Sequence, residues 1–409
     1  MAVIALSRIA STTQQNQVLS VLLKPVTAEF GWTRSTFIGA SAIGTVLGGL
    51  AAVLVGPLID RFGPRWVVFI GFFAMGGLMI AMGSIHSLWQ FYAILISTRL
   101  ILQGALNLSN NVVIPKWFIN RRGRASALAA MGQRVGAGAM PLVTERLVGG
   151  LGWRSAIVSL GLITWGLTLA PTGAFLRRRP EDVGLTPDGD LRTLPAEERP
   201  AEQRAEAVSE RSFTLRQTLR TRAFYILLVV VSLSTFTNAG INFNMYPLLT
   251  DRGLSDLQAV TIVSLWSYVG IPTTLMWGAL ADRFPSRLLL AAVLFGMGAG
   301  MALLTQVQDF LLGITFAIVH GFFFSGSLLL SNLIFANYFG RASFGIIRGF
   351  VTPFQMFSNA LGPLTATLVF DTRGEYALIV LAWAVLLPTL GVATLFASPV
   401  RRPNEPTGR

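Results

Sequence analysis

Gly56-Pro57-Leu58-Ile59-Asp60-Arg61-Phe62 is repeated 222 residues later as Gly278-Ala279-Leu280-Ala281-Asp282-Arg283-Phe284. The Gly, the Asp, the Arg and the Phe keep their places in both copies. Other residues obey the same offset: Arg65 and Arg287, Pro141 and Pro363, Gly152 and Gly374. A chain whose second half repeats its first, and which is apolar almost throughout, is predicted to consist of two fused helix bundles.

The composition indicates a membrane protein. Of the 409 residues, 53% are hydrophobic and 12% are charged, whereas a soluble globular chain carries about 25% charged residues. Apolar runs of about 20 residues recur along the whole chain, each bounded by a polar turn, as in a polytopic helical protein. The polar residues are too few to cover a soluble protein of this length.

Several kinds of site are excluded by the residue counts. The chain has no cysteine, so it has no disulfide, thiolate metal site or cysteine nucleophile. Its only histidines are His86 and His320, which excludes a histidine metal cluster. The start of the chain enters an apolar segment at once, without the basic region of a cleavable signal, so 1–23 is expected to be a first spanning helix.

Twelve spans are predicted, six on each side of a polar segment. That segment, 177–222, holds nine of the nineteen acidic residues and is rich in Pro, Glu and Arg, so it is expected to be a linker. The predicted division is 1–176 for the first bundle, 177–222 for the linker, 223–400 for the second bundle and 401–409 for a tail. The predicted spans are 2–23, 36–58, 66–84, 88–114, 125–148, 154–176, 223–249, 257–280, 287–305, 309–335, 346–370 and 376–397.

The basic residues predict the orientation. If the N-terminus is cytoplasmic, the cytoplasmic segments hold 23 Lys and Arg residues, the outer segments hold six, and three lie inside spans. This bias predicts that both termini are cytoplasmic. The net charge of +13 is therefore mostly a topology signal and does not indicate a nucleic-acid partner.

The twelve spans, the central linker and the doubled Gly-x-x-x-Asp-Arg-Phe phrase together resemble the major facilitator superfamily over the whole chain. Further phrases resemble its monocarboxylate-transporter-like branch, which includes the oxalate/formate exchangers. These phrases are Phe30-Gly31-Trp32-Thr33-Arg34-Ser35, the stretch from Trp117-Phe118 to Ala127, Gly152-Trp153-Arg154, and Arg179-Pro180-Glu181-Asp182-Val183-Gly184-Leu185. The resemblance implies two pseudo-symmetric six-helix bundles, an all-α membrane fold.

The repeated phrase is interpreted as a gating latch on the cytoplasmic side. A Gly lets a helix end approach its neighbour, and an Asp can meet a helix N-terminus or an Arg. Similar motifs in the family hold the cytoplasmic side closed. The alternative is a short basic turn that only sets topology. The latch residues would be Gly56, Asp60, Arg61, Arg65, Gly278, Asp282 and Arg283.

Polar side chains line up at helical spacing inside several spans, where they are costly unless they face the interior of the bundle. The stripes fall in the first, fourth, seventh and tenth spans, which line the central cavity in this superfamily, and also in the eleventh. Asn and Gln can equally hold helices together. The substrate-binding candidates are Gln14, Gln17, Asn107, Asn110, Arg134, Asn238, Asn242, Tyr246, Phe324, Gln355 and Asn359.

Three ionisable residues inside spans suggest mechanism. Arg134 is predicted to bind a substrate carboxylate, with pairing to Glu145 as the alternative. Arg99, followed by Gln103-Gly104, resembles the family's fourth-helix motif linked to coupling, with helix packing as the alternative. His320 titrates near neutral pH and is a candidate proton carrier, or else a structural histidine.

These features predict a secondary active transporter that works by alternating access, with neither enzymatic activity nor a cofactor. A phosphate-binding loop of the Walker type is absent. The expected substrate is a small organic monocarboxylate, moved by proton symport or exchange. The C-terminal half is amide-rich and aromatic, so a neutral or heteroaromatic solute such as the flavin-like vitamin riboflavin is an alternative, and drug efflux is a third. We expect a monomer in the lipid bilayer of a bacterial inner membrane.

Overall fold

The computed structural model describes residues 2–62, 64–109, 122–175, 215–339 and 344–398, and within these it leaves the side chains of 2, 52–53, 56–62, 64, 122–128, 175 and 344–346 undescribed. The described part is helical and contains no strand. Its elements are α1 (Ala2–Ser11), η1 (Thr12–Gln14), α2 (Asn16–Phe30), α3 (Arg34–Phe62), α4 (Pro64–Met82), α5 (Leu88–Leu100), η2 (Ile101–Leu106), α7 (Arg122–Phe175), α9 (Leu215–Thr218), α10 (Arg222–Asp251), α11 (Asp256–Ala281), α12 (Ser286–Gln306), α13 (Phe310–Phe339), α14 (Phe344–Arg373) and α15 (Ala377–Phe396).

These elements make the twelve predicted passages. The first passage is α1, η1 and α2 together, and the fourth is α5 continued by the π-helical η2. The long α7 contains two passages, because Gly152 has non-helical backbone angles and breaks it there. Among the described residues, eight helices are long and apolar enough to cross a membrane on length and composition alone. The predicted linker lies mostly outside the described residues, which include α9 at its end.

The first passage differs from its prediction. A continuous helix was expected over 2–23, but the helix breaks at Thr12–Gln14 and then runs on to Phe30. Gln15 is extended, with φ −81° and ψ 167°, so α2 begins anew at Asn16. The break coincides with a run of polar residues, Thr12 to Gln17, whose side chains can compete with the backbone for hydrogen bonds.

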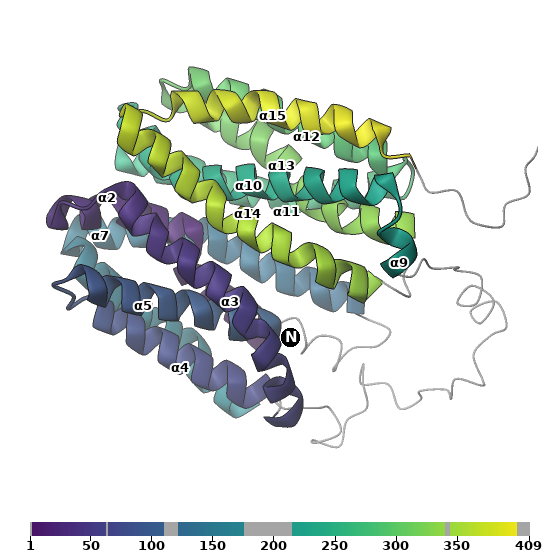
Figure 1. The fold of residues 1–409 in the computed structure, drawn as a ribbon. Coiled ribbons are helices and arrows are strands. Elements are labelled where there is room, and N and C mark those ends of the chain that lie inside the picture. Colours follow the sequence, from purple (N-terminus) through teal and green to yellow (C-terminus); the bar gives the residue numbers. More distant parts are fainter. Residues whose placement is uncertain (1, 63, 110–121, 176–214, 340–343, 399–409) are drawn as a thin grey trace, which may run out of the picture.

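Both halves pack their helices in the same way. In the first half α7 packs against α1 and α4, and α3 packs against α5. In the second half α10 packs against α14, α12 against α15, and α11 against α13. In the first half, passage 1 packs against 5, passage 3 against 6 and passage 2 against 4. In the second half the corresponding pairs are 7 with 11, 9 with 12 and 8 with 10. Figure 1 shows the two groups, the first from purple to blue and the second from teal to yellow.

The backbone repeats the 222-residue offset at its turns. Four described glycines have a left-handed φ: Gly31 (66°), Gly152 (78°), Gly253 (92°) and Gly374 (77°). They form two pairs at that offset, Gly31 with Gly253 and Gly152 with Gly374. A residue with a Cβ adopts this conformation only at a cost, so the duplication includes the geometry of corresponding turns.

The halves meet along three helix pairs. Each half has its own cluster of buried apolar side chains, and across the boundary α3 packs against α14, α7 against α11, and α2 against α10. We call the end of the bundle with the α2–α3, α10–α11 and α14–α15 turns the Arg34 end. The opposite end, where α9 and the α11–α12 turn lie, is the linker end (Figure 1).

Candidate substrate site and the Arg34-end network

Arg134 bridges the two halves. It lies on α7, and its Nη2 donates to Thr274 Oγ1 of α11 at 2.8 Å. Its guanidinium covers Gly270 of α11, where a Cβ would collide with it. The ion pairs found among the described residues do not include Arg134, so the alternative of pairing with Glu145 is not what the structure shows. The charge is met by one neutral hydroxyl.

Arg99 is a second arginine held by neutral groups, inside the first half. Its side chain is 2% exposed and its Nη2 donates to Asn16 Oδ1 at 2.6 Å. Asn16 is the first residue of α2, so Arg99 lies at the break in the first passage. Gly44 of α3 lies against it, because a Cβ at Gly44 would come within 2.6 Å of Arg99 Cβ. Arg99 therefore packs against α3 and is hydrogen-bonded to α2, and its role in coupling stays a prediction.

Two other candidates of the first half, Gln14 and Gln17, lie at the same break. Gln14 and Gln17 are buried, and neither the amide oxygen nor the amide nitrogen of Gln14 has a hydrogen-bond partner. Asn107 donates through Nδ2 to Gln103 Oε1 at 2.9 Å, directly after η2. Asn110 lies outside the described residues.

The amide stripe of the second half runs along α10 and meets α14. Gln355 donates to Thr235 Oγ1 at 3.5 Å, and the Oδ1 atoms of Asn238 and Asn242 are buried without a partner. Asn359 lies one turn further along α14 and is half-buried. These amides come from two helices of one half and face no described ionic partner.

Tyr246 is placed apart from this stripe. Its hydroxyl donates to Asp256 Oδ1 at 2.9 Å, at the start of α11 and therefore at the Arg34 end. The side chain is 5% exposed. A role for Tyr246 in binding substrate stays a prediction. In this structure its hydroxyl joins α10 to the start of α11.

His320 lies within the second half. Its side chain is fully buried and its ring stacks on Phe316, with centroids 5.3 Å apart. Trp266 and Phe324 pack beside it, with ring centroids 4.8 Å from each other. A Cβ at Gly300 of α12 would come within 2.9 Å of His320 Nδ1. The structure thus surrounds both His320 and Phe324 with aromatic rings, and the proton role of His320 stays a prediction.

The predicted latch is only partly visible at the linker end. The side chains of Asp60 and Arg61, and the surroundings of Gly56, lie outside what the structure describes. Arg65 donates to the carbonyl oxygen of Gly173 at 2.5 Å, a contact within the first half. In the second copy Asp282 and Arg283 are exposed. A Cβ at Gly278 would meet nothing within 4 Å, so close helix approach does not explain that glycine here.

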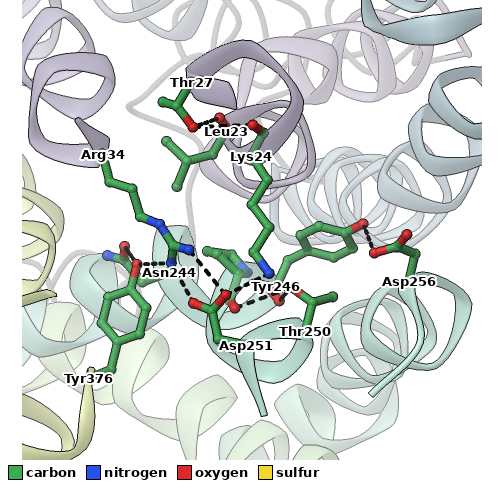
Figure 2. A network of polar contacts seen from close by, with 11 residues as sticks. Leu23, Lys24, Thr27, Arg34, Asn244, Tyr246, Thr250, Asp251, Asp256 and Tyr376 are labelled. Carbon is green, nitrogen blue, oxygen red and sulfur yellow. Dashed lines mark hydrogen bonds and ion pairs between the residues drawn. The ribbon is translucent and has the colours of Figure 1, made fainter. Parts of the chain in front are cut away.

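The Arg34 end holds a polar network that the sequence interpretation did not single out (Figure 2). Asp251 at the end of α10 accepts Lys24 Nζ at 2.6 Å and Arg34 Nη1 at 2.6 Å. Arg34 also donates to Tyr376 Oη at 3.0 Å, and Tyr376 donates in turn to Asn244 Oδ1 at 3.2 Å. From the sequence, Lys24 and Arg34 are two of the six outer basic residues and Arg34 belongs to the Phe30–Ser35 phrase, but no contact is predicted for either.

Asp371 adds a second contact between the halves at this end. Its carboxylate accepts the backbone N–H groups of Arg34 at 3.3 Å and Ser35 at 2.9 Å, the first two residues of α3. The guanidinium of Arg34 lies 3.7 Å from the ring centroid of Phe370. One acid of α14 therefore caps a helix that belongs to the other half.

A similar cluster lies inside the first half. Glu29 accepts a hydrogen bond from Trp153 Nε1 and two from Arg154, at 2.7 and 3.2 Å. The Trp153 bond and then the Arg154 guanidinium hold the pKa of Glu29 below its usual range. Arg154 is anchored further by the carbonyl oxygens of Gly83 and Ile85. This cluster ties α2 to the turn inside α7.

Comparison with known proteins identifies the fold. The model of the Major Facilitator Superfamily matches residues 4–363 and, in a second match, residues 227–409. A bacterial homologue of the human lysosomal transporter Spinster, solved in an inward-facing and occupied conformation, has the same fold. It superposes with a TM-score of 0.73 at 14% identity, covering 97% of this chain and 96% of that one.

Curated relatives cover most of the chain at 23% to 27% identity. The membrane sensor protein UhpC of Salmonella typhimurium is 27% identical over 84% of this chain and 80% of its own length. Monocarboxylate transporter 2 of Rattus norvegicus is 23% identical, over 93% of this chain and 77% of its own length. The probable sulfoacetate transporter SauU of Cupriavidus necator is also 23% identical, over 93% and 88%.

Proposed function

Because this chain belongs to the major facilitator superfamily, we propose that it is a secondary carrier that moves a small organic carboxylate across a membrane by alternating access. The relatives named for monocarboxylates and for sulfoacetate support an organic anion as cargo. The family supports a transporter and not an enzyme. Within this proposal the two halves rock about a site between them.

The observation that carries the proposal is the charge of Arg134 between the halves. An arginine at mid-membrane costs about 2.5–3.5 kcal/mol on insertion scales, and one hydroxyl, Thr274 Oγ1, does not neutralise it. A carboxylate would, through two parallel hydrogen bonds to the planar guanidinium. Arg134 lies on α7 and Thr274 on α11, so an anion bound there would contact both halves.

We propose exchange as the form of coupling. When the site is empty, the charge of Arg134 is uncompensated, which disfavours movement of the halves past one another without an anion. Such a carrier changes between its outward-open and inward-open states more readily when an anion is bound, in either direction of transport. Proton symport through His320 is the weaker proposal, because its ring is enclosed by Phe316, Trp266 and Phe324 and its side chain is fully buried.

The proposed orientation places the linker end in the cytoplasm of a bacterium. The excess of basic residues in the segments at that end supports it. The Arg34 end then faces outward. The cross-half ion pairs among the described residues, Lys24 and Arg34 with Asp251, lie at that outward end, which supports a state that is closed to the outside.

A second candidate function is sensing, which the relative named as a membrane sensor favours. A sensor would bind the same kind of solute without moving it at a useful rate. The heteroaromatic solute suggested by the second half has less support, because Phe324 and Trp266 pack on each other and on His320. Those rings contribute to the packing of one half.

The test is binding to the purified protein in detergent, read as a thermal shift. Acetate, lactate, oxalate and sulfoacetate would be compared with acetamide and lactamide, which keep shape but lose charge. We expect a carboxylate to stabilise the wild type and its amide not to. Arg134→Gln should weaken binding by about 10-fold or more, because a hydrogen bond to a charged group contributes about 1.5–3 kcal/mol.

Arg134→Lys is the matched control, since it keeps the charge and loses the bidentate geometry. An intermediate affinity is expected. If Arg134→Gln binds carboxylates as tightly as the wild type, or if amides bind equally well, the proposed role of Arg134 is wrong.

A further inference from the structure

The two halves differ in how they use corresponding residues at the Arg34 end. Position 29 is Glu and its counterpart at 251 is Asp, so both halves have an acid at the end of the helix that starts the half. Position 154 is Arg, but its counterpart at 376 is Tyr. The first acid has a basic partner in its own half, and the second acid has none at the corresponding place.

The contacts follow this difference. Glu29 pairs with Arg154 at 2.7 Å inside the first half. Asp251 instead takes both of its basic partners from the first half, Lys24 and Arg34, each at 2.6 Å. Tyr376 remains in the cluster but accepts a hydrogen bond from Arg34 at 3.0 Å. The two corresponding acids therefore differ in their partners: Glu29 pairs within its own half, and Asp251 pairs across the halves.

The corresponding helices α3 and α11 also differ in whether the acid at the helix start comes from the same half or from the other half. The first helical position is Arg34 in α3 and Asp256 in α11. A base is unfavourable and an acid favourable at a helix N-terminus. In α11 the cap is local, since Ser255 and Gln258 form a capping box. In α3 the acid comes from the other half, where Asp371 accepts the N–H groups of Arg34 and Ser35.

Arg34 is satisfied almost entirely by groups of the second half. Its side chain is 13% exposed and contacts Asp251, Tyr376 and Phe370. If the halves separated at this end, α3 would lose its acidic cap and Arg34 would lose its ion pair in one step. Opening this end would therefore break the side-chain contacts of Arg34 together with the Asp371 cap of α3.

We propose that Arg34, with Asp251 and Asp371, is a lock that holds the Arg34 end closed and sets how often the carrier opens to that side. The proposal rests on the proposed function only in taking the chain to alternate between two states. Glu29 and Arg154 do not belong to the lock, because both lie in the first half and move together.

The test measures the opening of this end directly, by pulsed electron paramagnetic resonance in proteoliposomes without substrate. Spin labels would be placed by Ala28→Cys at the end of α2 and Thr372→Cys at the end of α14, both exposed positions. The chain has no native cysteine, so the two labels are unique. Arg34→Gln should add a longer-distance population and raise the ratio of open to closed at least about fivefold, the scale of a typical coupling between states.

Asp251→Asn should act in the same direction and serves as the second variant if Arg34→Gln does not insert well. Exchanging the charges, with Arg34→Asp and Asp251→Arg together, should restore part of the closed population. Arg154→Gln is the matched control, since it removes an arginine–carboxylate pair at the same end but within one half. Its distance distribution should equal that of the wild type.

The lock is contradicted if Arg34→Gln and Asp251→Asn both keep the wild-type distribution, or if Arg154→Gln changes it as much as they do. The measurement uses no substrate. A failure here therefore leaves the carboxylate proposal untouched, and a failure of carboxylate binding leaves the lock untouched.

Discussion

At the scale of single residues, uncompensated charge is the most useful guide to this molecule. Arg134 was predicted from sequence as a cation inside a span, and the structure places it at the boundary of the halves, on Thr274. That placement could be anticipated, because a buried arginine needs an interior partner. The partner's identity could not, since a hydroxyl on another helix leaves no pattern along the chain.

Other residue predictions were less informative because spacing along a helix does not fix which neighbour a side chain meets. Tyr246 continues the polar stripe of α10, yet its hydroxyl reaches Asp256. His320 was singled out for its ability to titrate, and its ring is enclosed by aromatic side chains. The Arg34 network was missed, although aligning position 29 with 251 and 154 with 376 would have exposed an acid without its partner.

Glu29 gives a prediction about pH. Hydrogen bonds from Trp153 and Arg154 hold its pKa below the usual range, so the folded protein takes up this proton less readily than the unfolded chain. Its stabilising effect is complete above the unfolded pKa of about 4.3 and is lost as pH falls through the lower folded value. Glu29→Gln should therefore lower the apparent Tm at pH 7, and the difference from wild type should shrink below about pH 4.

The control for this prediction is Trp153→Phe, which keeps an aromatic ring and removes the Nε1–H donor. It should raise the pKa of Glu29 toward its usual range and move the loss of stability to higher pH. A Tm difference between wild type and Glu29→Gln that stays constant from pH 7 to pH 3 would contradict this account of the cluster.

At the scale of elements, the passages were predictable and their interruptions were not. Hydropathy locates the spans, because a segment that crosses the hydrocarbon core must be apolar and must satisfy its backbone hydrogen bonds within the helix. The 3₁₀ turn at Thr12–Gln14 and the π-helix at Ile101–Leu106 depend on how neighbouring helices pack. Both irregular segments lie close together, since Arg99, just before η2, bonds to Asn16, just after η1.

The contact between α10 and α14 supplies a prediction about packing. A Cβ at Gly362 of α14 would collide with the carbonyl oxygen of Phe236 on α10. Backbone cannot rotate away as a side chain can. Gly362→Ala should force the helices apart and destabilise the protein by about 1–3 kcal/mol, measured as a lower apparent Tm in detergent.

Gly349 offers a control in the same helix. A Cβ there would meet nothing within 4 Å, so Gly349→Ala should leave the apparent Tm unchanged or slightly raised. Equal Tm changes for the two substitutions would show that helix propensity decides the outcome at Gly362, and not the close approach to α10.

At the scale of the whole molecule, the doubled phrase predicted the architecture correctly. The offset that relates Gly56 to Gly278 also relates the left-handed glycines and the helix pairs of the two halves. The repeat could not predict how the halves differ, because their difference lies in single replacements such as Arg154 by Tyr376. At the Arg34 end, Asp251 lacks an arginine at position 376 of its own half and pairs with Lys24 and Arg34 of the other half.

The central claim is that this carrier moves organic carboxylates through a site built on Arg134. Counterflow in proteoliposomes tests it most directly, with the carboxylate that gives the largest thermal shift. Vesicles loaded with unlabelled carboxylate should transiently accumulate the labelled compound with the wild-type protein, while Arg134→Gln vesicles should not. A sensor or a channel would give no such accumulation. Accumulation by Arg134→Gln at the wild-type rate, or none by the wild type with any carboxylate, would contradict the claim.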